Sequence, residues 1–156
     1  MNYQHVIVPL DGSELAECVL PHLEAVASNC QVTTVELVRA VPPPEVRATV
    51  GFPVSGKQEA AIYEADVKEA EDYLLKVKAR LDPSRMKVTT RVLKGRISDV
   101  LADYLNKSQA DLLLIATHGR SGPSRWYWGS VADRLLRSSC TPVFMVRAPG
   151  CGLEEK

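Results

Sequence analysis

The chain has 156 residues, a length that favours a single domain whose core can form without disulfides or bound metal. Its 19 lysines and arginines balance its 19 aspartates and glutamates. This balance gives no support to a general affinity for nucleic acid or for an anionic membrane, so any anion-binding site must be local.

The cysteines and the first residues indicate a cytoplasmic protein. The four cysteines form no C-x-x-C pair and no zinc-like Cys/His cluster. Cys18 and Cys30 lie too far apart along the first expected helix for a disulfide, so we interpret the cysteines as reduced thiols. Residues 1–5 lead directly into a strand, which argues against a signal peptide, and no apolar run approaches the roughly 20 residues of a membrane span.

The first half of the chain predicts two strands and two helices. Residues 5–10 are an apolar run rich in β-branched side chains, as in a strand buried on both faces. Ser13 is a suitable N-cap for a helix that ends near Ser28. Residues 32–38 are a second strand, and three prolines then open a loop to about residue 57, long enough to be functional or mobile. The longest helical pattern covers residues 58–80.

The second half continues the alternation of strands and helices. Strands are expected at residues 86–93, 111–116 and 142–146, and helices from residue 97 to about 105 and from 130 to about 138. Ser130 is expected to cap the last helix, with Asp133 three residues on as a variant of the capping box. Residues 149–156 are expected to be a disordered tail after a single domain that covers residues 1–148.

This order predicts an α/β fold with one open, doubly wound parallel sheet of five strands and helices on both faces. With the strand order 3-2-1-4-5, the winding reverses between the first and fourth strands. Ligands of such sheets bind there, beyond the carboxyl ends of the strands. The loops that begin at Pro9 and at Ala116 should therefore border one crevice.

The segment from Ala116 to Ser130 is the main candidate for a phosphate site. An apolar strand stops near Gly119, nine residues follow, and Gly129-Ser130 opens a helix. Such a loop can turn several backbone N–H groups toward one anion, and Ser130 can donate to a phosphate oxygen. The alternative is an ordinary connection with a serine cap.

Other candidates border the same crevice. Asp11 could accept from a ribose hydroxyl or contact Mg²⁺ indirectly, or it could only bond its own turn. Arg120 and Arg125 could neutralise phosphate charge or be ordinary exposed arginines. His118 could be a polar contact, an acid/base group, or a loop histidine that bonds the backbone.

The aromatic segment Trp126-Tyr127-Trp128 could form an exposed partner surface, or at least one of its rings could pack beneath the loop. No Ser-His-Asp order, nucleophile elbow or metal-ligand helix is found, so no catalytic residue is assigned.

Together these segments resemble the universal stress protein family over residues 6–146. The resemblance rests on Val8-Pro9-Leu10-Asp11-Gly12-Ser13-Glu14, on Ala116-x-x-Gly119-(nine residues)-Gly129-Ser130, and on Cys140-Thr141-Pro142-Val143-Phe144-Met145-Val146. It implies ATP, or AMP or ADP, in the crevice, with Asp11 near the ribose or metal, Leu37 against adenine and Gly95 lining the cleft. The implied nucleotide-binding set is completed by Pro9, Ala116, His118, Gly119, Arg120, Arg125, Gly129, Ser130 and Val131.

One position departs from the signature of ATP-binding members, because Ala116 stands where they carry the first glycine. An alanine is tolerated there if its backbone is in the β region, but it clashes if a positive φ or close phosphate contact is needed.

We therefore expect an ATP-binding regulatory protein with Mg²⁺ accompanying the phosphates and with at most slow ATPase or autophosphorylation, since no general base is evident. The resemblance also implies a homodimer through residues 142–147, an apolar edge strand, unless Pro142 and Arg147 shield that edge. The alternatives are a nucleotide-free interaction module of the same fold and an enzyme that transfers AMP or phosphate.

Overall fold

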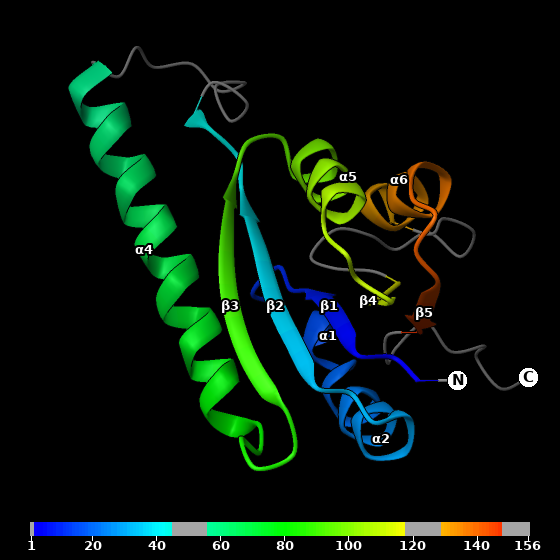
Figure 1. Ribbon diagram of the computed structural model, residues 1–156. Coiled ribbons are helices and arrows are strands. Elements are labelled where there is room, and N and C mark those ends of the chain that lie inside the picture. Colours follow the sequence, from blue (N-terminus) through cyan, green and yellow to red (C-terminus); the bar gives the residue numbers. More distant parts are fainter. Residues whose placement is uncertain (1, 45–55, 118–128, 148–156) are drawn as a thin grey trace, which may run out of the picture.

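The computed structural model describes residues 2–44, 56–117 and 129–147, which form one five-stranded parallel sheet flanked by helices (Figure 1). The strand order is β3-β2-β1-β4-β5, which confirms the predicted order and fold class. The strands are β1 (His5–Pro9), β2 (Thr34–Val41), β3 (Lys87–Lys94), β4 (Leu112–Ala116) and β5 (Val143–Val146). The helices are α1 (Glu14–Glu17), α2 (Leu20–Cys30), α4 (Gly56–Arg80), α5 (Ile97–Lys107) and α6 (Ser130–Ser138).

Two apolar cores cover the two faces of the sheet. Alternate side chains of a strand point to opposite faces. In β1, Val6 and Val8 therefore pack with the core beneath α1, α2 and α4, whereas Ile7 packs with the core beneath α5 and α6. This two-sided burial is why β1 and β4 read as continuous apolar runs rather than as alternating ones.

The first helix is interrupted where the sequence predicted one continuous helix. Helix α1 ends at Glu17, and α2 begins at Leu20. The physical reason is Pro21, whose ring clashes with the carbonyl four residues earlier and which fits only in a first helical turn. The predicted N-cap at Ser13 is confirmed, since its Oγ accepts from the N–H of Ala16 at 3.1 Å.

The predicted cap of the last helix is wrong. Gly129, not Ser130, is the N-cap of α6, and it is the Gly129 carbonyl that accepts from Asp133 N at 3.0 Å. Ser130 is the first helical residue, so the capping box does not form. The Asp133 carboxylate instead accepts from Arg137 Nε at 3.0 Å, one helical turn ahead.

Gly95 makes the turn between β3 and α5 possible. Its φ is +143°, a conformation that L side chains rarely adopt, and a Cβ there would collide with Val100 Cγ1. Its N–H donates to the Val41 carbonyl at 3.0 Å, which fixes the turn against the end of β2.

We therefore expect Gly95→Ala to lower the free energy of unfolding by about 2–4 kcal/mol, because it adds both backbone strain and overpacking. Urea denaturation measures this loss. Gly56→Ala is the matched control, since a Cβ on Gly56 would meet nothing within 4 Å. Equal stabilities of the two variants would contradict this account of the turn.

Candidate functional site

The candidate crevice lies where the winding of the sheet reverses. Strands β1 and β4 are parallel neighbours, with Val6 opposite Leu112 and Ile7 opposite Leu113. Pro9 ends β1 and Ala116 ends β4, so the segments that follow both strands leave the same edge of the sheet. The structure thus brings together the ends of the two strands after which the sequence predicted the site.

The turn after β1 holds Asp11 in a fixed orientation. Asp11 Oδ1 accepts from the backbone N–H of Ser13 at 2.9 Å and from its hydroxyl at 2.6 Å. Gly12 has a φ of +87°, and the N–H of Leu10 donates to the Val38 carbonyl at 2.8 Å. The carboxylate therefore bonds its own turn, as the simpler interpretation expected, and this bonding places it beside the crevice.

The start of α6 is the second predicted part of the site. Gly129 has a negative φ, and a Cβ there would meet none of the described residues within 4 Å. Ser130 is exposed, and Val131 is half-buried and packs against the core beneath α6. Among the described residues, none occupies the space beside Gly129 at this helix N-terminus.

Ala116 meets the condition under which its methyl group is tolerated. It lies within β4 opposite Val146, and it packs partly buried against the core beneath α1 and α2. Among the described residues, the only non-glycine residue with positive φ is Gln31. The extended backbone of Ala116 thus gives no conformational reason for glycine at position 116.

The structure gives the positions of two further predicted residues, Leu37 and Gly95. The Leu37 side chain is 0% exposed and enclosed in the core shared with α2 and α4, so the structure does not bring it to an adenine site. Gly95 lies in the turn between β3 and α5, where its N–H donates to the carbonyl of Val41 at the end of β2. His118, Gly119, Arg120, Arg125 and the aromatic segment 126–128 lie outside the described residues.

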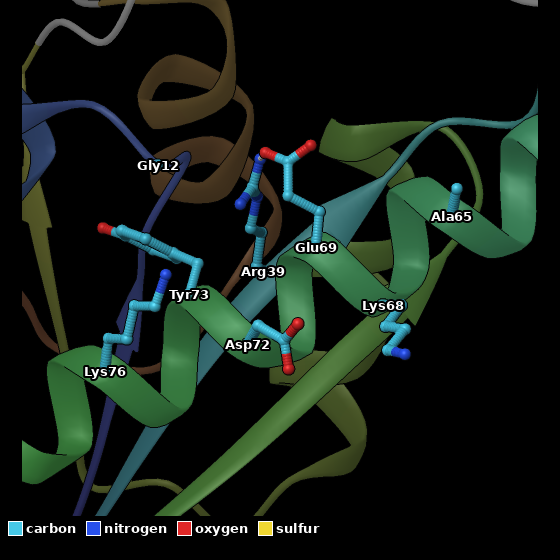
Figure 2. A pocket seen from close by; sticks show the side chains of 8 residues that line it. All are labelled: Gly12, Arg39, Ala65, Lys68, Glu69, Asp72, Tyr73 and Lys76. Carbon is cyan, nitrogen blue, oxygen red and sulfur yellow. Dashed lines mark ion pairs between the residues drawn. The ribbon is translucent and has the colours of Figure 1, made fainter.

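A groove that the sequence analysis missed lies between α4 and the β1–α1 turn (Figure 2). It encloses about 450 Å³. Its lining residues are Gly12, Arg39, Ala65, Lys68, Glu69, Asp72, Tyr73 and Lys76. Arg39 could have been noticed as the one charged residue in the alternating series Val35, Leu37, Arg39, Val41, but the expected strand ended at residue 38.

Polar contacts tie this turn to α4. Glu17 of α1 accepts from the Tyr73 hydroxyl at 3.0 Å and from Arg80 Nη2 at 2.6 Å. Burial, and then the hydrogen bond to Glu17, raise the pKa of Tyr73 far above that of a free phenol. Tyr73 is therefore a hydrogen-bond donor at all physiological pH values.

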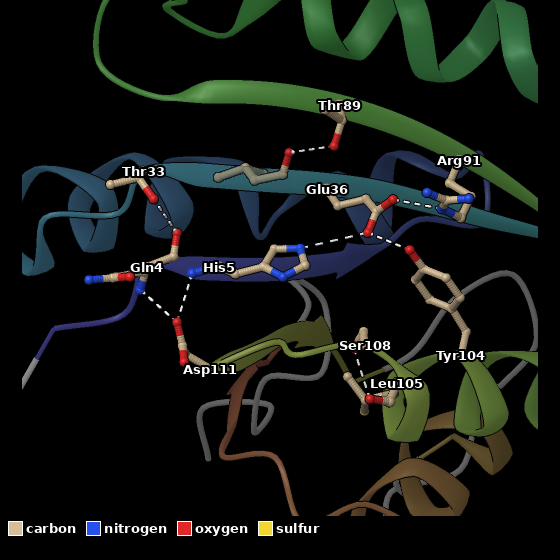
Figure 3. Close-up of polar contacts among 11 residues, drawn as sticks. Gln4, His5, Thr33, Glu36, Thr89, Arg91, Tyr104, Leu105, Ser108 and Asp111 are labelled. Atoms are coloured by element: carbon tan, nitrogen blue, oxygen red, sulfur yellow. Dashed lines mark hydrogen bonds and ion pairs between the residues drawn. The ribbon is translucent and has the colours of Figure 1, made fainter.

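A second polar group missed from the sequence is Glu36, the only charged residue buried among those described (Figure 3). It lies on β2 facing α5, where it accepts from Arg91 Nε at 2.7 Å and from the Tyr104 hydroxyl at 2.7 Å. His5 Nε2 lies 3.7 Å from the same carboxylate. The group joins three strands to α5, and its satisfied hydrogen bonds indicate a structural role.

Within residues 2–44, 56–117 and 129–147, no group of three or more His, Cys, Asp or Glu side chains could hold a metal ion. No helix in these ranges combines the length and apolar character needed to cross a membrane.

A family model described as the universal stress protein family matches residues 2–147. The chain belongs to the universal stress protein family. A universal stress protein of Methanocaldococcus jannaschii is 29% identical over 147 residues, which cover 94% of this chain and 84% of the relative.

Solved structures agree with this fold. The structure of the M. jannaschii protein MJ0577 superimposes with a TM-score of 0.81 at 20% identity and covers 96% of this chain and 99% of its own. A universal stress protein in complex with cAMP is 25% identical, with a TM-score of 0.60 over 95% of this chain and 99% of its own. A universal stress protein family protein of Arabidopsis thaliana with AMP bound superimposes with a TM-score of 0.64 at 12% identity. The match covers 94% of this chain and 93% of that protein's chain.

The hydrogen bond from Tyr104 to Glu36 makes the stability of this universal stress protein depend on pH. Burial, and then the hydrogen bond to Glu36, raise the pKa of Tyr104 to about 12, whereas an unfolded phenol titrates near 10. As the pH rises, the phenol therefore loses its proton in the unfolded chain first. The contribution of the protonated Tyr104 to the free energy of unfolding is complete below pH ~10 and is lost toward pH ~12. With Tyr104→Phe, the free energy of unfolding measured with urea should decline less between pH ~9.5 and ~11.5 than it does in the wild type. An unchanged slope would contradict the assigned pKa.

Proposed function

We propose that this chain is a regulatory adenine-nucleotide-binding protein that takes ATP, or AMP or ADP, in the crevice between the loops after β1 and β4. The supporting observation is that β1 and β4 are parallel neighbours at the reversal of the sheet, so that the Asp11 turn and the chain leading to α6 both follow the same end of the sheet. Related structures with AMP and with cAMP bound make an adenine nucleotide the favoured ligand.

In this proposal the phosphates lie at the N-terminus of α6. The backbone N–H groups after Gly129 and the Ser130 hydroxyl would donate to phosphate oxygens, with help from Gly119, Arg120, Arg125 and His118. The extended backbone of Ala116 is compatible with this arrangement. Pro9 and Val131 would line the crevice.

The ribose lies near Asp11, whose carboxylate is already oriented by Ser13. Since the described residues provide no metal-binding cluster, Mg²⁺ would be held mainly by the phosphates, with Asp11 reaching it through water. The adenine would lie beyond the carboxyl end of β2, because the Leu37 side chain is enclosed and its backbone is in the strand that pairs with β1 and β3.

Nucleotide would act as a regulatory ligand of a cytoplasmic protein rather than as a substrate. No general base among the described crevice residues is positioned to activate water, so any hydrolysis or autophosphorylation would be slow. Titration calorimetry with Mg-ATP distinguishes this proposal from a nucleotide-free interaction module, for which no heat of binding is expected. Rapid steady-state release of ADP would instead indicate an enzyme.

Gly129→Val should weaken Mg-ATP binding by more than about tenfold, because its side chain would fill the open space at the start of α6 without disturbing the fold. The same result is expected for Gly119→Val. Gly56→Val, the same change at the start of α4, is the control and should keep wild-type affinity in calorimetry. Wild-type affinity in both crevice variants would mean that the site is misplaced.

We also propose a homodimer through β5, the edge strand beside β4. Phe144 is 41% exposed on this short strand, and its ring lies 6.1 Å from that of His22, so the exposed surface of β5 adjoins α2. Unpaired edges of this kind favour pairing across a two-fold axis.

Phe144→Glu should convert the dimer to a monomer, because it introduces two like charges near the two-fold axis. Light scattering after size exclusion measures the mass. Leu75→Glu, at an exposed leucine of α4, is the matched control and should leave the mass unchanged. A monomeric wild type, or a dimeric Phe144 variant, would refute this interface.

A further inference from the structure

The groove beside α4 contains a charged side chain that nucleotide binding as proposed above does not use. Arg39 leaves β2 on the α4 face, and its side chain is only 14% exposed. Figure 2 shows it between the Tyr73 ring and Glu69, with the guanidinium directed toward Gly12. Arg39 is thus placed in the groove by the sheet, whereas the other charged lining residues belong to α4.

The partners of Arg39 among the described residues hold it in place but leave its charge weakly compensated. Its Nη2 lies 3.6 Å from Glu69 Oε1, and the Glu69 side chain is 71% exposed. Its Cζ lies 5.1 Å from the centroid of the Tyr73 ring, a cation–π contact. A stacked guanidinium presents a rigid fork of N–H donors, which matches the oxygens of a phosphate.

The guanidinium also lies against the turn that carries Asp11. A Cβ on Gly12 would be 3.1 Å from Arg39 Cζ and 3.2 Å from both terminal nitrogens. In doubly wound sheets that bind dinucleotides, the residue near the end of the second strand faces the ribose, and an arginine there accommodates a phosphate on the ribose. Arg39 occupies the corresponding place in this sheet.

We propose that Arg39 makes the site selective for an adenine nucleotide that carries an additional phosphate on its 2′ or 3′ ribose oxygen. This inference rests on the proposed nucleotide function. The ribose phosphate displaces Glu69, which is free to turn into solvent, and accepts two hydrogen bonds from Arg39. Lys68 and Lys76 on the groove add positive charge, which opposes the repulsion from Asp72, Glu69 and Asp11.

Calorimetry on the full chain with adenosine 3′,5′-bisphosphate, adenosine 2′,5′-bisphosphate and 5′-AMP tests this selectivity. The wild type should bind one bisphosphate about tenfold more tightly than 5′-AMP, the effect of one charge-assisted contact. Arg39→Met keeps the aliphatic stem and should bring this ratio close to one. Arg39→Lys keeps the positive charge but not the paired N–H donors of the guanidinium, and it should lower the ratio of bisphosphate affinity to 5′-AMP affinity several-fold. Arg137→Met, at an arginine of α6 paired with Asp133, is the control and should keep the wild-type ratio.

The outcomes separate this inference from the function on which it rests. If the wild type binds neither Mg-ATP nor any of the three nucleotides, the proposed function fails. If it binds Mg-ATP but none of the three, only the role of Arg39 is overturned. If it binds 5′-AMP as tightly as both bisphosphates, or if Arg39→Met keeps the selectivity, only the role of Arg39 is overturned. If thermal melting shows Arg39→Met to be unfolded, the ratio of Arg39→Lys decides, and an undiminished ratio overturns the inference.

Discussion

The structure depends on the burial of β1 and β4 side by side with apolar cores on both faces. Right-handed connections place the helices after β1 and after β4 on opposite sides of these strands. The chain must therefore separate at their carboxyl ends, which is where ligands of such sheets bind. The same constraint that builds the core thus positions the Asp11 turn and the start of α6.

Most of the fold could be predicted because strand and helix periods alternate clearly along the chain. The sheet order was predictable, and so was the N-cap at Ser13, whose hydroxyl has the expected acceptor role. The break before Pro21 was missed because helical apolar spacing continues through it, although the ring of that proline forbids one continuous helix. The cap at Gly129 was missed because Ser is the commoner capping residue.

The candidate site was only partly predictable, since side-chain direction in a strand follows from register. Leu37 lies in β2, yet its side chain faces the core that α4 covers. Arg39, two residues on, faces the same side and reaches the groove because the strand continues to Val41. Glu36 was overlooked because a charged residue in an apolar strand gives no sign, in the sequence, of the partners on β3 and α5 that compensate it.

The buried carboxylate of Glu36 also constrains how the edge of the sheet can assemble. Arg91 comes from β3, an outer strand with only one neighbour. If β3 paired one residue out of step, Arg91 would point to the opposite face, and Glu36 would stay buried without its charged partner. Misaligned pairing therefore carries an electrostatic penalty in addition to its loss of apolar packing, so one acidic residue enforces the alignment of an otherwise permissive outer strand.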